Sequence, residues 1–187
     1  MSRAVDPGWG EAMRKIPVAL LPTRGMRLAA GSGDGLTVMR IAWITFTVAM
    51  VLVGVVVVVV DQTAPGGGVD GRVVGGVVLA IGVFAQVVSN KFVPDVEGAT
   101  MPSARGTAQR AFFVRVAFAQ PAVLLGFMGF AISGNVAVYA LGFVVGLAGM
   151  LDAAPTAGWI EKGQTQLKAS GSDVELLAAL VGGGITR

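Results

Sequence analysis

The chain contains no cysteine and no histidine, and only 13% of its 187 residues are charged. These absences exclude disulfides, thiolate nucleophiles, haem ligation through histidine and zinc sites built on either residue. This charged fraction is low, because soluble domains have about 25% charged residues. In addition, 54% of this chain is hydrophobic. The hydrophobic residues lie in long blocks nearly free of charge, which is typical of segments surrounded by lipid. We therefore expect an all-α integral membrane protein.

Four hydrophobic blocks predict a four-helix transmembrane bundle over residues 41–154. The predicted spans are residues 41–60, 73–93, 112–132 and 136–154. A helix of about 20 residues is about 30 Å long, the thickness of the hydrocarbon core. Helices are favoured even over the valine run at 55–60, because an open strand in lipid leaves backbone groups unpaired. The three-residue connection at 133–135 predicts a tight turn, and we expect two antiparallel helical hairpins.

The positions of the basic residues predict the orientation in the membrane. All but Arg72 of the 14 Lys and Arg residues lie in the two tails, in the loop between the second and third spans, or at span ends facing them. The positive-inside rule then places both termini and that loop in the cytoplasm. The net charge of +3 has the same origin, so nucleic acid is not an expected partner. We expect a multi-pass protein of the plasma (inner) membrane.

The two tails carry different signals. Residues 1–40 are rich in Gly and Pro and predict a cytoplasmic tail that is either flexible or, through the basic stretch from Arg14, laid along the membrane surface. Residues 155–187 predict a cytoplasmic tail with a short amphipathic helix at about 173–181. Ser172 and Glu175 have the spacing of a capping box before an apolar stripe. The bilayer, the bundle and another subunit all remain candidates for the surface on which this helix docks.

Small residues spaced three or four apart predict the faces on which the spans pack. Helices in lipid associate through close backbone contact, which requires small side chains. The predicted helix-packing residues are Gly75, Gly82, Gly126, Gly129, Gly142 and Gly146.

A few polar residues interrupt the spans. Gln86 and Gln120 have similar predicted depths, which suggests a hydrogen bond between their amides. Pro121 lacks an N–H and so leaves the carbonyl of Ala117 without its usual partner. Arg115 lies in the first turn of its span, where it either reaches the headgroups or pairs with Asp152.

Two resemblances can be named. The residues AFAQPA at 117–122 and LLGF at 124–127 resemble the ion-carrying helix of rotary ATP synthase c subunits. That family has a carboxylate where this chain has Gln120, so its ion translocation is not implied here. The whole chain, including the tail WIEKGQTQLKASGSDVELLAAL from Trp159, resembles the uncharacterised four-span membrane proteins of high-GC Gram-positive bacteria, a resemblance that implies no activity.

The placement of the acidic residues bears on function. They lie in tails, loops or span ends, so no buried carboxylate pair is available for acid–base catalysis or a proton relay. We expect a small non-enzymatic protein with no catalytic residue, cofactor or metal, acting as an accessory or scaffold subunit of a membrane complex. Its expected partners are the lipid bilayer and either other membrane subunits or a second copy. The alternative is an oligomeric channel or transporter with a polar constriction at Gln86 and Gln120.

Overall fold

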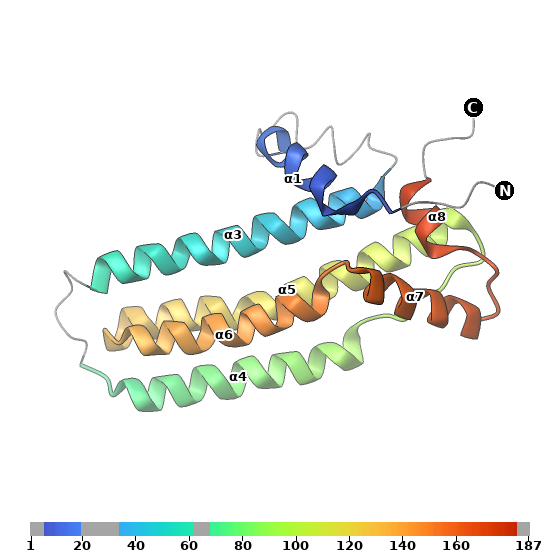
Figure 1. Ribbon diagram of the computed structural model, residues 1–187. Helices are drawn as coiled ribbons and strands as arrows, with labels where there is room; N and C mark the ends of the chain where they lie inside the picture. Colours follow the sequence, from blue (N-terminus) through green and yellow to red (C-terminus); the bar gives the residue numbers. More distant parts are fainter. Residues whose placement is uncertain (1–5, 20–33, 62–67, 183–187) are drawn as a thin grey trace. The chain divides into compact units, whose positions relative to one another are not determined.

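The computed structural model describes residues 6–19, 34–61 and 68–182, and within these ranges the regular structure is helical (Figure 1). The helices are α1 (Gly8–Ala19), α3 (Gly35–Asp61), α4 (Gly71–Phe92), α5 (Met101–Ser133), α6 (Val136–Ala153), α7 (Ala157–Ala169) and α8 (Leu176–Val181). Four of the described helices, α3 to α6, are long and apolar enough to cross a membrane. The expectation of an all-helical fold with four helices able to cross a membrane is therefore confirmed.

The chain divides into two compact units. The terminal unit contains the described residues up to 45, residues 94–113 and the described residues from 154 onward. The bundle contains the described residues among 46–93 together with residues 114–153. Helices α3 and α5 each contribute one part to each unit.

Within the bundle, α5 and α6 lie between α3 and α4 (Figure 1). The Tyr139 hydroxyl of α6 donates a hydrogen bond of 2.7 Å to the backbone carbonyl of Met50 in α3. On the opposite side, a Cβ at Gly82 of α4 would lie 3.0 Å from Val145 of α6 and 3.2 Å from Ala122 of α5. The first and second predicted spans are thus both in contact with the pair formed by the third and fourth.

The predicted packing glycines lie at these helix contacts. Gly75, Gly82, Gly126, Gly129, Gly142 and Gly146 are all buried. The closest approach is between α5 and α6, where a Cβ at Gly126 would lie 3.0 Å from the Cα of Gly142 and 3.2 Å from the carbonyl oxygen of Tyr139. Backbone meets backbone at this point, so no side chain can move aside to admit a larger residue.

Helices α3 and α5 begin before the predicted membrane spans, which start at residues 41 and 112. At the start of α3, Asp34 accepts hydrogen bonds from the backbone N–H and the hydroxyl of Thr37, which caps the helix. Before α5, the backbone N–H groups of Thr100 and Ser103 each donate to the other residue's hydroxyl, over 3.1 and 3.4 Å. Polar caps therefore extend both helices beyond their apolar runs.

The two tails contain more structure than predicted. In the first, α1 begins where the carboxylate of Asp6 accepts a hydrogen bond of 2.8 Å from the backbone N–H of Gly8. Residues 20–33 of the predicted tail lie outside the described residues. In the second, the structure contains α7, which was not predicted. The side chain of Thr156 caps this helix by accepting a hydrogen bond from the N–H of Trp159.

The predicted helix at 173–181 is shortened to α8, and the predicted capping box is wrong. The hydroxyl of Ser172 donates 2.7 Å to the carbonyl oxygen of Gly98, and Glu175 makes no side-chain capping hydrogen bond. The N–H of Leu176 donates instead to the side-chain oxygen of Gln164, at 2.6 Å. A side chain from α7 therefore caps α8.

Candidate functional site

The two glutamines of the bundle contact different groups. The amide nitrogen of Gln120 donates to the sulfur atoms of Met50, at 3.8 Å, and Met150, at 3.7 Å. The amide nitrogen of Gln86 is buried and has no hydrogen-bond partner among the residues that the structure describes, and its side chain packs against Gly149, leaving no room for a Cβ there. The predicted hydrogen bond between Gln86 and Gln120 is therefore wrong.

Both glutamines are poorly satisfied for amides that lie among apolar helices. Thioether sulfur is a weak hydrogen-bond acceptor, and an amide nitrogen without a partner in an apolar medium costs free energy. Pro121, which follows Gln120 inside α5, has no N–H to offer the carbonyl of Ala117. This part of the bundle has hydrogen-bonding capacity that the described residues do not use.

The structure brings Arg115 of α5 and Asp152 of α6 together. Their nearest charged atoms, Nη1 and Oδ2, are 3.4 Å apart, and the same guanidinium nitrogen lies 3.5 Å from the backbone carbonyl of Asp152. The Arg115 side chain is 14% exposed and that of Asp152 is 63% exposed. Only one end of the pair is shielded from solvent, so its contribution to stability is modest.

Exchanging the two charges tests this ion pair. We expect Arg115→Asp and Asp152→Arg each to lower the free energy of unfolding, and the double exchange to recover about 0.5–1 kcal/mol of the summed loss, since that is the usual strength of a partly exposed pair. Reversible unfolding in mixed detergent micelles measures all three variants. If the double variant recovers no free energy of unfolding, the pairing with Asp152 is contradicted, and contact with lipid headgroups remains as the role of Arg115.

A buried arginine organises the terminal unit. Arg40 is 1% exposed and donates two hydrogen bonds to the carboxylate of Asp6, over 2.6 and 2.8 Å. Its guanidinium lies 5.1 Å from the centre of the Trp9 ring, and Trp9 in turn packs edge-on against Trp43. The Arg40 hydrogen bond lowers the pKa of Asp6, with burial acting in the opposite direction. This cluster joins α1 to the start of α3.

Helices α7 and α8 are held on the segment that precedes α5. Gln166 of α7 accepts from the backbone N–H of Val96 at 3.3 Å and donates to the carboxylate of Asp95 at 2.7 Å. Gln164 donates to the carbonyl of Val174 at 3.0 Å in addition to capping α8. The buried apolar residues of these segments include Val96, Ala104, Ala108, Leu167, Leu176 and Leu180.

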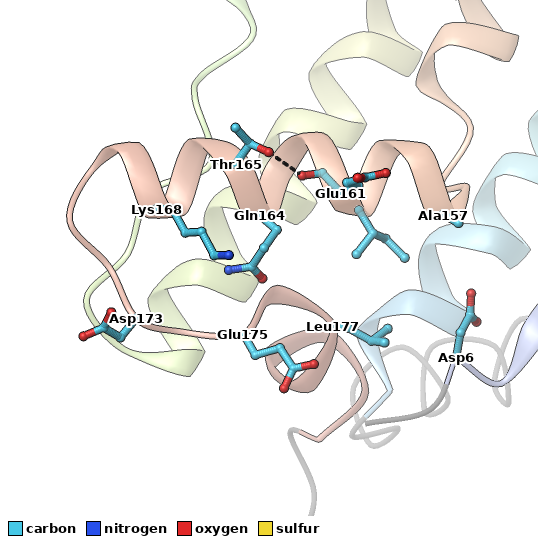
Figure 2. A pocket seen from close by; sticks show the side chains of 10 residues that line it. Asp6, Ala157, Glu161, Gln164, Thr165, Lys168, Asp173, Glu175 and Leu177 are labelled. Atoms are coloured by element: carbon cyan, nitrogen blue, oxygen red, sulfur yellow. Dashed lines mark hydrogen bonds between the residues drawn. The ribbon is translucent and has the colours of Figure 1, made fainter. Parts of the chain in front are cut away.

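An open groove of about 650 Å³ runs along α7 and α8. Figure 2 shows Gln164 and Lys168 on the side of α7 that faces Glu175 and Leu177. Asp173 and Asp6 lie at opposite ends of the groove in that view. The lining combines the apolar residues Ala157, Ile160 and Leu177 with four carboxylates, from Asp6, Glu161, Asp173 and Glu175, and one ammonium group, from Lys168.

The charges of this acidic groove are spread out rather than convergent. Among the described residues, no group of three or more acidic side chains is arranged to hold a metal ion. Separate carboxylates beside apolar residues suit an extended ligand that carries several positive charges and some apolar surface.

Sequence reasoning missed most of this groove. Asp6, Glu161 and Lys168 were assigned to the two tails, and Glu161 and Lys168 lie in α7, which lacks the apolar run by which spans are recognised. The available signal was Thr156 after Pro155, a helix start, followed by Ile160, Gly163 and Leu167 at helical spacing. Gly163 and Leu167 are indeed buried.

The comparisons with known proteins add no family: no protein-family model matches the chain, and no curated protein or solved structure is significantly similar to it.

Proposed function

We propose that this protein is a non-enzymatic accessory or scaffold subunit of a membrane complex. The observation that carries the proposal is the acidic groove of the terminal unit, where carboxylates flank apolar side chains. Such a surface recognises a basic amphipathic segment, because opposite charges steer the encounter and apolar contact holds the complex. The bundle supplies the membrane anchor.

The proposal includes an orientation. With the basic residues distributed as they are, both termini, and with them α1, α7 and α8, lie on the cytoplasmic side of the plasma (inner) membrane. Consecutive spans then run antiparallel: α5 and α6 form a hairpin through the short turn at 133–135, and α3 and α4 run antiparallel on opposite sides of that pair. The groove faces the cytoplasm, and its ligand is a basic segment of another subunit.

The alternative of an oligomeric channel with a constriction at Gln86 and Gln120 has less support. Gln120 donates to methionine sulfurs and Gln86 packs against Gly149, so the two amides do not face each other. A constriction would have to be built by residues of several copies.

Neutralising the acidic groove tests the accessory role. We expect the double variant Glu161→Gln and Glu175→Gln to bind its partner about tenfold more weakly, since two partly exposed ionic contacts are lost. Both side chains are exposed, so folding should be preserved. The measurement is purification in a mild detergent, followed by native mass spectrometry of the intact complex.

The matched control is Glu97→Gln, which removes an exposed carboxylate of the terminal unit that does not line the groove. It should retain the partner as the unaltered protein does. A particle that contains only copies of this chain, in every variant, would contradict the accessory role and favour the channel.

A further inference from the structure

A second groove, of about 440 Å³, lies between α3 and α5 within the bundle. On α5 the groove is lined by residues that include Gln120, Leu124 and Phe127. Because they are spaced four and three residues apart, these three lie on one face of the helix. On α3 it is lined by residues that include Met50, Val53 and Val56. Its volume falls within the range of small-molecule sites, about 300–1,000 Å³.

Gln120 is the polar side chain of this α3–α5 groove; the other lining residues are apolar. Within the described part of the chain, its amide nitrogen has only two thioether sulfurs as hydrogen-bond acceptors. A carbonyl oxygen is a much better acceptor than thioether sulfur. A ligand that brings a carbonyl to Gln120 therefore gains a hydrogen bond while displacing weak ones.

We propose that the α3–α5 groove binds an uncharged acyl lipid, with the ester carbonyl accepting a hydrogen bond from Gln120. The acyl chain lies along Val53, Val56, Leu124 and Phe127, whose apolar side chains offer no competing polar contact. This inference does not depend on the acidic groove, which belongs to the other unit.

The requirement for an uncharged head follows from position along α5. Arg115, paired with Asp152, lies five residues before Gln120, about 7.5 Å along the helix axis. If the ester of a lipid reached Gln120, its head group would be displaced along α5 from the level of that ion pair toward Gln120. A charged head resists such transfer, because desolvating an ion is far more costly than desolvating a hydroxyl.

Native mass spectrometry with added 1-monooleoylglycerol tests the proposal. We expect the unaltered protein to bind one equivalent. The variant Gln120→Leu should bind about three- to tenfold more weakly, the loss of one hydrogen bond. The variant Leu124→Trp should abolish binding, because a bulky ring fills the groove. Leu124 is 59% exposed, so this variant stays informative even where Gln120→Leu impairs folding.

The matched control is Leu151→Trp, at a side chain that is 60% exposed and does not line the groove; its affinity for the lipid should be unchanged. Oleoyl lysophosphatidylcholine, which has the same chain and a charged head, should bind more weakly than monooleoylglycerol. Equal binding of the two lipids would contradict the requirement for an uncharged head group. Binding unaffected by Leu124→Trp would overturn the site.

Discussion

Replacement of Gly142 by alanine is expected to lower the free energy of unfolding of the bundle by about 3 kcal/mol, the upper part of the usual range for overpacking. The added Cβ would collide with the carbonyl oxygen of Ala122 and lie 2.8 Å from the Cα of Gly126. Both obstacles are backbone atoms of α5, so relief requires the two helices to separate. Separation would in turn weaken the close contact that holds helices together in lipid.

The matched control is Gly76→Ala in α4, where an added Cβ meets nothing within 4 Å. This substitution should leave stability unchanged or raise it by up to about 1 kcal/mol, because alanine favours a helix more than glycine does. Reversible unfolding in mixed detergent micelles, followed by far-ultraviolet circular dichroism, measures both variants. Equal effects of the two substitutions would show that the α5–α6 contact is looser than the structure indicates.

Replacement of Asp6 by asparagine is expected to have the second large effect. It should lower the free energy of unfolding of the terminal unit by about 2 kcal/mol. Breaking a fully buried ion pair costs about 3–5 kcal/mol because one charge stays buried without a partner. Here Arg40 is 1% exposed but Asp6 is 34% exposed, so solvent screens part of the interaction. Near-ultraviolet circular dichroism, which reports the packing of Trp9 against Trp43, should show α1 detaching at a lower temperature.

The same pair predicts a dependence on pH. The pKa of Asp6 is lowered from its ordinary value of 3.8 by the hydrogen bond from Arg40. The stabilisation is therefore complete above that ordinary value and is lost as the pH falls through the lowered pKa. The difference between Asp6→Asn and the unaltered protein should shrink below about pH 3.8. Glu11→Gln, which breaks the ion pair with Lys15 within α1, is the control and should cost less than about 1 kcal/mol.

The membrane helices were predictable because lipid imposes a simple rule. Every backbone group must be paired and every outward side chain must be apolar, so a span is visible as a run such as residues 41–60 without any knowledge of its neighbours. The packing glycines were predictable for a related reason: close approach of helices in lipid requires small residues. Gly126 and Gly142, which meet between α5 and α6, are the example.

Apart from the pairing of Arg115 with Asp152, which was one of two predicted alternatives, the polar contacts were not predictable, because each depends on a partner distant in the sequence. The sequence predicted similar depths for Gln86 and Gln120. The direction in which each side chain points depends on helix rotation, which the sequence does not show. In the structure, Gln120 faces Met50 and Met150 instead of Gln86. In the same way, Gln164 rather than Ser172 caps α8.

The sequence by itself thus determined the helical class, the four spans and the glycine faces, because these follow from the transfer of backbone and side chains into lipid. Only the tertiary structure decided that Arg40 is a buried partner of Asp6. It also decided that the last tail folds into α7 and α8 beside an acidic groove. The physical reason is that burial of polar groups is paid for by specific long-range hydrogen bonds, and such pairings leave no local pattern.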